Sequence, residues 1–193
     1  IVRTEQTNLG NLTAEANLWM AKFYDSTTVI SIKNGGGIRS AIGNVIAVGD
    51  NVTLAPPIAN PSAGKQSGDI SQLDIENSLR FNNKLSLVTL TATGLRSILE
   101  NAVAGTTATA TPGQFAQVAG VRYSYNFSNA VGSRILNAVV TDTNGNIIDT
   151  LVLNGVTQGN LSRTFRVVTL NFLAGGGDSY PFNTLGTSRV DLD

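Results

Sequence analysis

The sequence predicts an α+β fold, with helices prominent early in the chain and antiparallel strands late. Apolar residues recur at helical spacing in the first part, and β-rich segments prevail after residue 115. The sequence Asp142-Thr143-Asn144-Gly145, between two of those segments, is typical of a hairpin turn. The length of 193 residues suits one domain, or one domain with a modest subdomain.

The first predicted element is a helix over residues 8–24, with Asn8 as its N-terminal cap. Its apolar residues lie mostly at helical spacing, and we expect them to pack into the core rather than to contact a cofactor. They are Leu9, Leu12, Ala16, Leu18, Trp19, Ala21 and Phe23. The short β-branched segment over residues 27–33 then fits a buried strand.

Three consecutive glycines follow that strand, in the sequence Asn34-Gly35-Gly36-Gly37-Ile38-Arg39. Glycine loses more backbone freedom on folding than any other residue, so this run indicates a sharp turn or a close approach to another group. The Arg39 guanidinium offers a planar fork of donors that suits a carboxylate or a phosphate. An anion pocket and an ordinary tight loop with a solvated arginine both fit the stretch, which matches no P-loop or dinucleotide-binding fingerprint.

The remaining segments extend the same pattern along the chain. A short apolar run over residues 43–50 precedes a surface loop over residues 55–68, which hold three of the five prolines. Helices are predicted over residues 70–79 and 95–103. Strands are predicted over residues 84–92, 115–127, 134–141, 147–153 and 163–173. A second glycine cluster, Gly175-Gly176-Gly177-Asp178, follows the last strand.

Composition narrows the function classes. The chain has no cysteine and no histidine, which excludes a Ser-His-Asp triad, a thiolate site and a histidine-ligated zinc. Its 13 basic and 13 acidic residues cancel, which argues against a nucleic-acid partner. The acidic residues are scattered, so no metal site is expected, and no apolar run is long enough to span a membrane. A cysteine-free chain that starts at Ile1 suits a mature fragment or excised domain of an exported bacterial protein.

Two phenylalanines and one aspartate have positions that suit ligand contact. Phe81 lies in the polar sequence Arg80-Phe81-Asn82-Asn83, and Phe172 precedes the second glycine cluster. A phenylalanine in a loop or at a strand end can stack on a flat ligand, although packing in the core is its more common role. Asp178 can likewise serve only to cap its turn.

Five motifs occur in order along nearly the whole chain. They are Glu5-Gln6-Thr7-Asn8-Leu9-Gly10-Asn11-Leu12, Asn34-Gly35-Gly36-Gly37-Ile38-Arg39, Phe81-Asn82-Asn83 with Leu85-Ser86-Leu87-Val88-Thr89-Leu90, Gly113-Gln114-Phe115-Ala116-Gln117-Val118-Ala119-Gly120, and Asn171-Phe172-Leu173-Ala174-Gly175-Gly176-Gly177-Asp178. With these motifs the chain resembles the C-terminal domain of the 5'-nucleotidase family of metallophosphoesterases. The resemblance implies a mixed sheet with packed helices, and a single substrate-binding domain over residues 1–193.

The resemblance also implies a pocket for the nucleoside. The base would lie between Phe81 and Phe172, with Asn34 in contact with it and Gly113 lining the pocket. Asp178 would hold the ribose hydroxyls. The chemistry agrees, because aromatic rings stack on bases and a carboxylate accepts hydrogen bonds from a diol.

The same resemblance places the phosphate end of the ligand near arginines. Arg39 would contact the phosphate from the glycine motif that contains Gly36 and Gly37. Arg3 would contact it from the start of the chain. A guanidinium is suited to a phosphate by charge and by geometry.

In this family the chemistry belongs to a separate N-terminal metallophosphatase domain that carries two divalent metal ions. The resemblance therefore implies no catalytic residue, metal or cofactor in this chain, and leaves open whether the chain alone is an enzyme. The whole protein would be a periplasmic or extracellular phosphohydrolase of nucleotide catabolism. Two alternatives remain: a related substrate such as a nucleotide sugar, cyclic nucleotide or dinucleotide, or a non-catalytic ligand-binding or adhesive domain of a multidomain surface protein.

Overall fold

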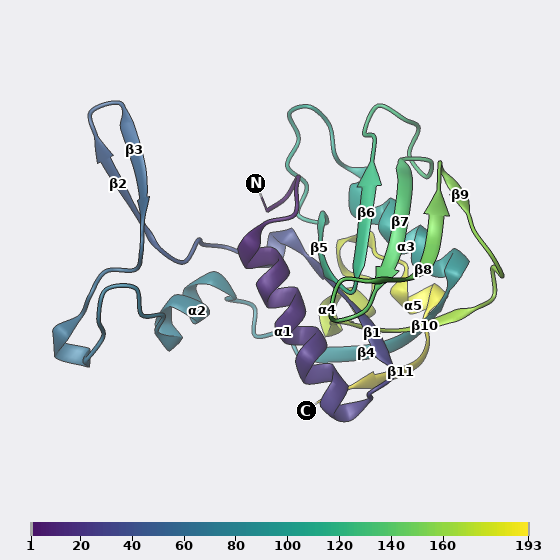
Figure 1. The fold of residues 1–193 in the computed structure, drawn as a ribbon, viewed down its shortest axis with the longest axis horizontal. Coiled ribbons are helices and arrows are strands. Elements are labelled where there is room, and N and C mark those ends of the chain that lie inside the picture. Colours follow the sequence, from purple (N-terminus) through teal and green to yellow (C-terminus); the bar gives the residue numbers. More distant parts are fainter. Residues whose placement is uncertain (1, 193) are drawn as a thin grey trace. The chain divides into compact units, whose positions relative to one another are not determined.

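The computed structural model describes residues 2–192, which form two compact units. The first unit comprises the chain up to Gly36 and again from Asn83 onwards, and the second comprises Gly37–Asn82. The second unit is therefore an insertion in the sequence of the first (Figure 1).

The first unit is built on a five-stranded sheet with the strand order β11-β4-β10-β1-β5. Its strands are β1 (Thr28–Asn34), β4 (Leu85–Thr91), β5 (Ala116–Ala119), β10 (Thr164–Leu170) and β11 (Thr187–Asp191). β1 and β10 run parallel, and the other neighbouring pairs are antiparallel. The predicted α+β fold with a mixed sheet is thus confirmed. β11 had no prediction, because its five residues are all exposed and show no apolar alternation.

A second sheet in the same unit has the order β6-β7-β8-β9. Its strands are β6 (Val121–Tyr125), β7 (Ile135–Thr141), β8 (Ile147–Leu153) and β9 (Val156–Thr157). β7 and β8 are antiparallel neighbours, and Gly145 N donates to Asp142 O at 3.1 Å in the turn between them. The predicted hairpin turn is therefore confirmed.

The single strand predicted over residues 115–127 is wrong, because the two sheets divide it between β5 and β6. The division falls at Gly120, whose φ of 71° lies in the left-handed region. A Cβ at this position would overlap with the carbonyl oxygen of Val29. Glycine thus allows both the turn and the close approach, and the chain passes from one sheet to the other.

Helix α1 (Asn8–Tyr24) has the predicted bounds, but its cap is Thr7 and not Asn8. Thr7 Oγ1 accepts a hydrogen bond from Gly10 N at 3.1 Å, which satisfies one of the unpaired amide groups of the first turn. The helix packs against β1 and β5. Its buried residues are Gly10, Ala14, Leu18 and Ala21, which repeat at intervals of four and three.

The prediction that the apolar residues of this helix pack into the core is wrong for Ala16, which is exposed, and for three larger residues. The exposed fractions of Leu12, Trp19 and Phe23 are 59%, 65% and 69%. The mostly small residues of the buried stripe let the helix lie close to the sheet, so these larger side chains fall on the outer face. Trp19 and Phe23 instead contact each other edge to face, with ring centroids 4.5 Å apart.

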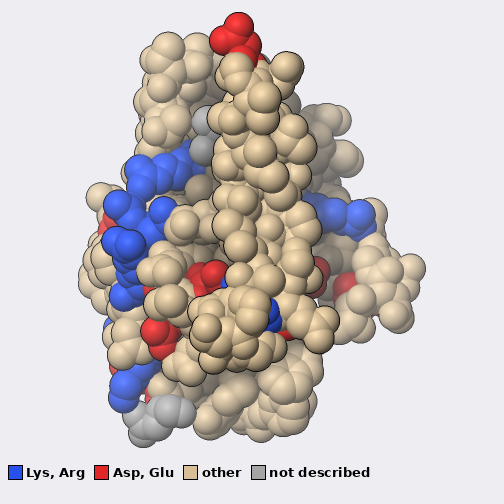
Figure 2. Space-filling model, turned by 90° about the vertical axis from the view of Figure 1, so that its left-hand side faces the viewer, with Lys and Arg blue, Asp and Glu red and all other residues tan. Residues whose placement is uncertain are grey.

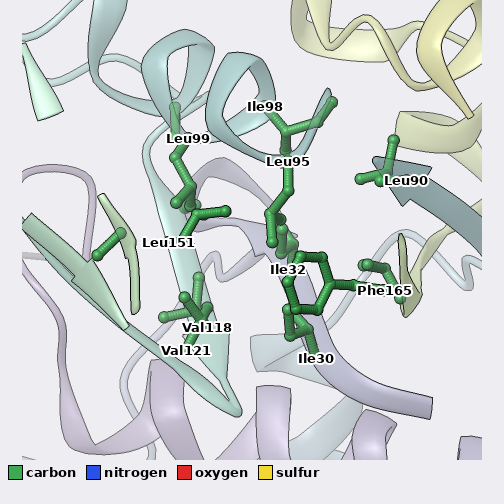
Figure 3. Close-up of a cluster of buried hydrophobic side chains, with 14 of the residues drawn as sticks. Ile30, Ile32, Leu90, Leu95, Ile98, Leu99, Val118, Val121, Leu151 and Phe165 are labelled. Carbon is green, nitrogen blue, oxygen red and sulfur yellow. The ribbon is translucent and has the colours of Figure 1, made fainter. Parts of the chain in front are cut away.

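Helix α3 (Ala92–Ala104) packs on the opposite face of the five-stranded sheet from α1. Figure 3 shows Leu95, Ile98 and Leu99 of α3 above Ile30 and Ile32 of β1, in the larger of the two apolar clusters. These side chains are fully buried. The helix predicted over residues 95–103 lies within α3, whose true start is capped by Thr91 through a hydrogen bond from Gly94 N at 3.0 Å.

The chain after β10 turns into short helices. They are α4 (Asn171–Ala174), the 3-10 turn η3 (Gly177–Ser179) and α5 (Phe182–Leu185). The strand predicted over residues 163–173 ends at Leu170, because Gly175 N donates to Asn171 O at 3.0 Å and closes a helical turn. Phe172 accordingly lies on a helix and not at a strand end.

The second unit contains a hairpin that the sequence did not predict. Strands β2 (Asn44–Val48) and β3 (Asn51–Ala55) pair through the turn Gly49-Asp50, where Gly49 has a φ of 59°. The two strands are mostly exposed and present no buried apolar face, so they lack the alternation that marks a half-buried strand. The predicted loop over residues 55–68 holds the 3-10 turn η2 (Pro61–Ala63). The helix predicted over residues 70–79 is observed as α2 (Gln72–Ser78). Ser71 and Asp74 form a capping box at its start.

Candidate functional site

Two predicted site residues from distant parts of the sequence meet in the first unit. Asn34, at the end of β1, donates from Nδ2 to Asp178 Oδ2 at 2.6 Å. Asn34 is buried, and its Oδ1 has no hydrogen-bond partner among the described residues. Asp178 Oδ2 is therefore held by the protein, while Asp178 Oδ1 remains for a ligand or a solvent molecule. Asn34 Oδ1, in contrast, is itself buried.

The two predicted glycines beside these residues bring their backbones into contact. Gly36 N donates to Gly113 O at 2.7 Å, and Gly35 N donates to Phe115 O at 2.6 Å. A Cβ on Gly36 would lie 2.8 Å from Gly113 Cα, a distance that real side chains do not adopt. A Cβ on Gly113 would lie 3.9 Å from Asp178 Oδ2. Gly36 is thus needed for the close approach, whereas a Cβ on Gly113 would make only ordinary contacts. The approach brings residues 34–36, 113 and 178 to one place.

Phe172 is held against the second glycine cluster. A Cβ on Gly177 would overlap with the Phe172 ring, so the ring lies directly on the Gly177 backbone. The Phe172 side chain nevertheless remains 46% exposed. An aromatic ring that is supported on one side and half exposed can stack on a flat ligand.

The start of the chain is fixed next to the first glycine cluster. A Cβ on Gly35 would overlap with Val2 O, which also accepts a hydrogen bond from Gln117 Nε2 at 2.9 Å. Arg3 directly follows Val2, so its backbone lies near Gly35. Gln117 Nε2 also donates to Glu5 O at 2.6 Å, and a Cβ on Gly10 would overlap with the Gln117 side chain. These contacts explain why the motif of residues 5–12 carries a glycine.

The other predicted site residues, Gly37, Arg39 and Phe81, belong to the second unit. Arg39 N donates to Ser78 O at 2.8 Å, and the Arg39 guanidinium carbon lies 5.8 Å from the centroid of the Phe81 ring. This cation–π contact joins a positive charge to an aromatic ring that is 58% exposed. Such a pair suits a ligand with one anionic and one flat part. That Arg39 and Phe81 join the residues of the first unit in one pocket stays a prediction.

A groove of about 730 Å³ runs along α3 in the first unit, lined by residues that include Arg96, Glu100, Asn101, Val156 and Ser179. Its charged groups have structural roles. Glu100 accepts from the backbone N of Arg134 and of Ile135 at 2.8 and 3.1 Å. Arg96 Nη1 donates to Thr157 Oγ1 at 3.3 Å. We therefore place the candidate site at Asn34 and Asp178, which do not line this groove.

Burial changes the proton affinity of two side chains near the site. Lys33 precedes Asn34 and is only 3% exposed, and burial lowers its pKa to about 8. Burial raises the pKa of Tyr180, whose hydroxyl donates to Gln114 O at 2.6 Å. Tyr180 therefore remains a neutral donor at physiological pH.

Only 13% of the residues are charged, a small share for a folded protein. Figure 2 shows one face, on which residues that are neither basic nor acidic predominate. Among residues 2–192, no three Asp or Glu side chains gather to form a metal site, and no helix is long and apolar enough to cross a membrane.

Three residues that contact the site's loop were missed from the sequence. They are Asn101, Gln114 and Tyr180, which contact residues 177–180 or one another. Asn101 lies within a helix and Tyr180 outside the family motifs, so no pattern singled them out. Gln114 lay in a quoted motif but had no assigned role.

Comparisons with known proteins find similarity over nearly the whole chain. A family model described as "5'-nucleotidase, C-terminal domain" matches residues 1–186. The chain is 32% identical over 191 residues to the trifunctional nucleotide phosphoesterase protein YfkN of Bacillus subtilis. The matched region covers 99% of this chain and 11% of that protein. It is 28% identical over 181 residues to the 5'-nucleotidase of Vibrio cholerae, covering 94% of this chain and 24% of that protein.

A solved structure is similar over the same length. The 5'-nucleotidase precursor from Thermus thermophilus superposes with a TM-score of 0.71 and 30% identity, over 99% of this chain and 31% of that chain. The chain thus spans less than a third of the length of each of these three relatives.

Proposed function

Because the chain belongs to the family of 5'-nucleotidase C-terminal domains, we propose that it is the nucleotide-recognition domain of a phosphohydrolase that removes phosphate from nucleotides. The observation that carries the proposal is the hydrogen bond between Asn34 and Asp178. It joins two family motifs at a place where the backbones of Gly36 and Gly113 also meet.

Asp178 binds the ribose in this proposal. Its Oδ2 is fixed by Asn34, and its Oδ1 makes no hydrogen bond to the described residues. A carboxylate oxygen with free lone pairs accepts hydrogen bonds from the vicinal hydroxyls of a ribose. Because the acceptor is charged, such a bond is stronger than one between neutral groups.

The base stacks between Phe172 and Phe81 in this proposal. Phe172 is supported by the Gly177 backbone and is half exposed, which suits one wall of a stacking site. Phe81 is also exposed in its own unit. Asn34 borders the base in this proposal, and its buried Oδ1 has no hydrogen-bond partner among residues 2–192.

Arg39 and Arg3 hold the phosphate end. Arg39 lies against Phe81, so neighbouring side chains from the two ends of the second unit would contact the anion and the base. Arg3 is anchored through Val2, next to the first glycine cluster. Two guanidinium groups would orient the phosphate for attack, which is a positioning role.

The hydrolytic chemistry lies outside this chain in the proposal. Two divalent ions on an N-terminal metallophosphatase domain of the same protein would supply an activated water and stabilise charge at phosphorus. The chain alone is then expected to release no phosphate from AMP, with added divalent metal, above a boiled control. The relatives include a protein described as a 5'-nucleotidase precursor, and we propose that the present protein is exported to the periplasm or the exterior.

Calorimetric titration of the chain with adenosine tests the proposal. We expect binding by the wild type and weaker binding by Phe172→Ala and by Asp178→Asn. Asparagine tolerates the left-handed backbone at position 178 and keeps an acceptor for Asn34, so the second variant removes the charge and the ligand-facing acceptor but not the partner of Asn34. Absence of adenosine binding by the wild type, or equal binding by Phe172→Ala, would reject the site.

A further inference from the structure

We propose that Asn101 is a positioning residue of the ribose site, which with Gln114 and Tyr180 holds the loop of residues 177–180 in the shape that presents the Asp178 carboxylate. The inference rests on the proposed role of Asp178 and goes beyond it. It assigns a function to three residues that lie outside the ligand contacts described above.

The loop that carries Asp178 has an unfavourable backbone. Asp178 and Ser179 have φ values of 50° and 60°, so two consecutive residues other than glycine are left-handed. Each such residue costs about 1 kcal/mol or more, and the conformation persists only where the surroundings enforce it. Tyr180 N donates to Gly177 O at 3.1 Å, but this turn alone does not fix the direction of the Asp178 side chain.

Asn101 supplies one of the restraints. It lies on α3, and its Nδ2 donates to Asp178 O at 3.3 Å. Asn34 holds the carboxylate of the same residue at 2.6 Å from the end of β1. Asp178 is thus held at its backbone by a helix and at its side chain by a strand, and both elements belong to the buried core of the first unit.

Gln114 and Tyr180 connect these restraints in a closed ring. Gln114 Nε2 donates to Asn101 O at 2.6 Å. Tyr180 OH donates to Gln114 O at 2.6 Å, and the Tyr180 side chain is only 1% exposed. The ring runs from Asn101 to Asp178, along the chain to Tyr180, and through Gln114 back to Asn101. Loss of one member therefore loosens the loop without removing a ligand contact.

A comparison of two ligands separates positioning from general stability. Adenosine and 2',3'-dideoxyadenosine share the base, but only adenosine has the hydroxyls that Asp178 would bind. We expect the wild type to prefer adenosine by about tenfold or more, the usual effect of a hydrogen bond to a charged group. In Asn101→Ala the preference should fall to about threefold or less, with dideoxyadenosine affinity unchanged within about twofold.

Asn17→Ala is the matched control. It makes the same change within a helix, at a partly buried asparagine whose Nδ2 has no hydrogen-bond partner in the described part of the chain. It should keep the full preference for adenosine. Tyr180→Phe is the second test, because it removes one hydroxyl while the ring keeps its stacking on Phe182, and it should lose preference in the same way. Circular dichroism establishes whether each variant is folded. If Asn101→Ala does not fold, the nucleoside preference of Tyr180→Phe tests the inference instead.

The outcomes are distinct. A wild type that binds both nucleosides equally would reject the ribose role of Asp178, and the inference with it. A wild type that prefers adenosine, with folded Asn101→Ala and Tyr180→Phe variants that keep the full preference, would overturn the inference alone. An equal loss of affinity for both nucleosides would show that Asn101 acts on stability and does not position Asp178.

Discussion

The Gln117 side chain occupies the space that a Cβ on Gly10 would need. Gln117 cannot move freely, since Nε2 donates to Val2 O and Glu5 O and Oε1 accepts from Thr7 N at 3.0 Å. Gly10→Ala should therefore lower the free energy of unfolding by about 1–3 kcal/mol, despite the better helix propensity of alanine. Urea unfolding followed by circular dichroism measures this.

Gly94→Ala is the control for that prediction, because Gly94 lies in the first turn of α3 as Gly10 does in α1. A Cβ on Gly94 would have Thr91 Oγ1 as its nearest neighbour, at 3.3 Å. It should change stability by less than about 1 kcal/mol. Equal effects of the two substitutions would contradict the role of Gln117.

Arg134 should be important for the end of α3. Its Nη1 donates to the carbonyl oxygens of Val103, Ala104 and Thr106 at 2.7, 2.7 and 3.0 Å. The last carbonyls of a helix have no partners within it, so Arg134→Ala should lower the free energy of unfolding by about 2–4 kcal/mol. Arg122→Ala removes an exposed arginine that donates to one carbonyl, Gly145 O, and should cost less than about 1 kcal/mol. A similar loss for both variants in thermal unfolding would refute the prediction.

Lys33 should destabilise the fold at neutral pH. The pKa of Lys33 is about 8 in the folded protein, whereas an exposed lysine, as in the unfolded chain, has a pKa of 10.5. Between pH 8 and pH 10.5 the unfolded chain therefore binds more protons than the folded protein, and the free energy of unfolding rises with pH. Lys33→Met should therefore stabilise the protein by about 1–3 kcal/mol at pH 7, and this gain should shrink towards zero near pH 10.5. Denaturant unfolding at pH 7 and pH 10 checks it. An equal gain at both pH values would mean that packing, and not the burial of charge, causes the effect.

Gly177→Ala should weaken nucleoside binding without unfolding the protein. The added methyl group would overlap with the Phe172 ring and displace it from its place on the loop. Because a base that stacks on an aromatic side chain gains about 1–3 kcal/mol, we expect adenosine affinity to fall by about tenfold. Gly175→Ala is the neighbouring control, since its Cβ would lie 3.4 Å from the nearest atom, Asn171 O. Unchanged affinity in Gly177→Ala would separate Phe172 from the binding site.

The elements that the sequence predicted well have apolar residues that the structure buries on one or both faces. α1, β1, β4 and α3 carry strong periodicity or β-branched runs, and the structure places them within a few residues of the predicted ranges. The hairpin of β2 and β3 was missed because both of its faces are exposed. The split at Gly120 was missed because the residues on both sides are β-rich, and only the carbonyl of Val29 in space makes the glycine necessary.

The candidate site, like the fold, was predicted from the sequence only in part. The family resemblance assigned Asn34, Gly113 and Asp178 to one pocket, but it did not predict the hydrogen bond between Asn34 and Asp178 or the contact of Gly36 with Gly113. The role of Asn101 could not be predicted, because it depends on one hydrogen bond across 77 residues of sequence. Trp19 was assigned to the core from its spacing, yet the sheet accepts only a narrow stripe of mostly small residues on α1.

The insertion of residues 37–82 leaves the first unit where β1 ends and returns where β4 begins. β10 is parallel to β1 and antiparallel to β4, and Leu170 at its end pairs with Leu85. The exit and the return therefore lie at the same end of the sheet, two strands apart, or about 10 Å. A segment attached at two nearby points can be lengthened, shortened or replaced at little entropic cost, about 0.6 kcal/mol for each doubling in length. Evolution and protein engineers can thus exchange the module that carries Arg39 and Phe81 while the sheet that carries Asn34 is kept.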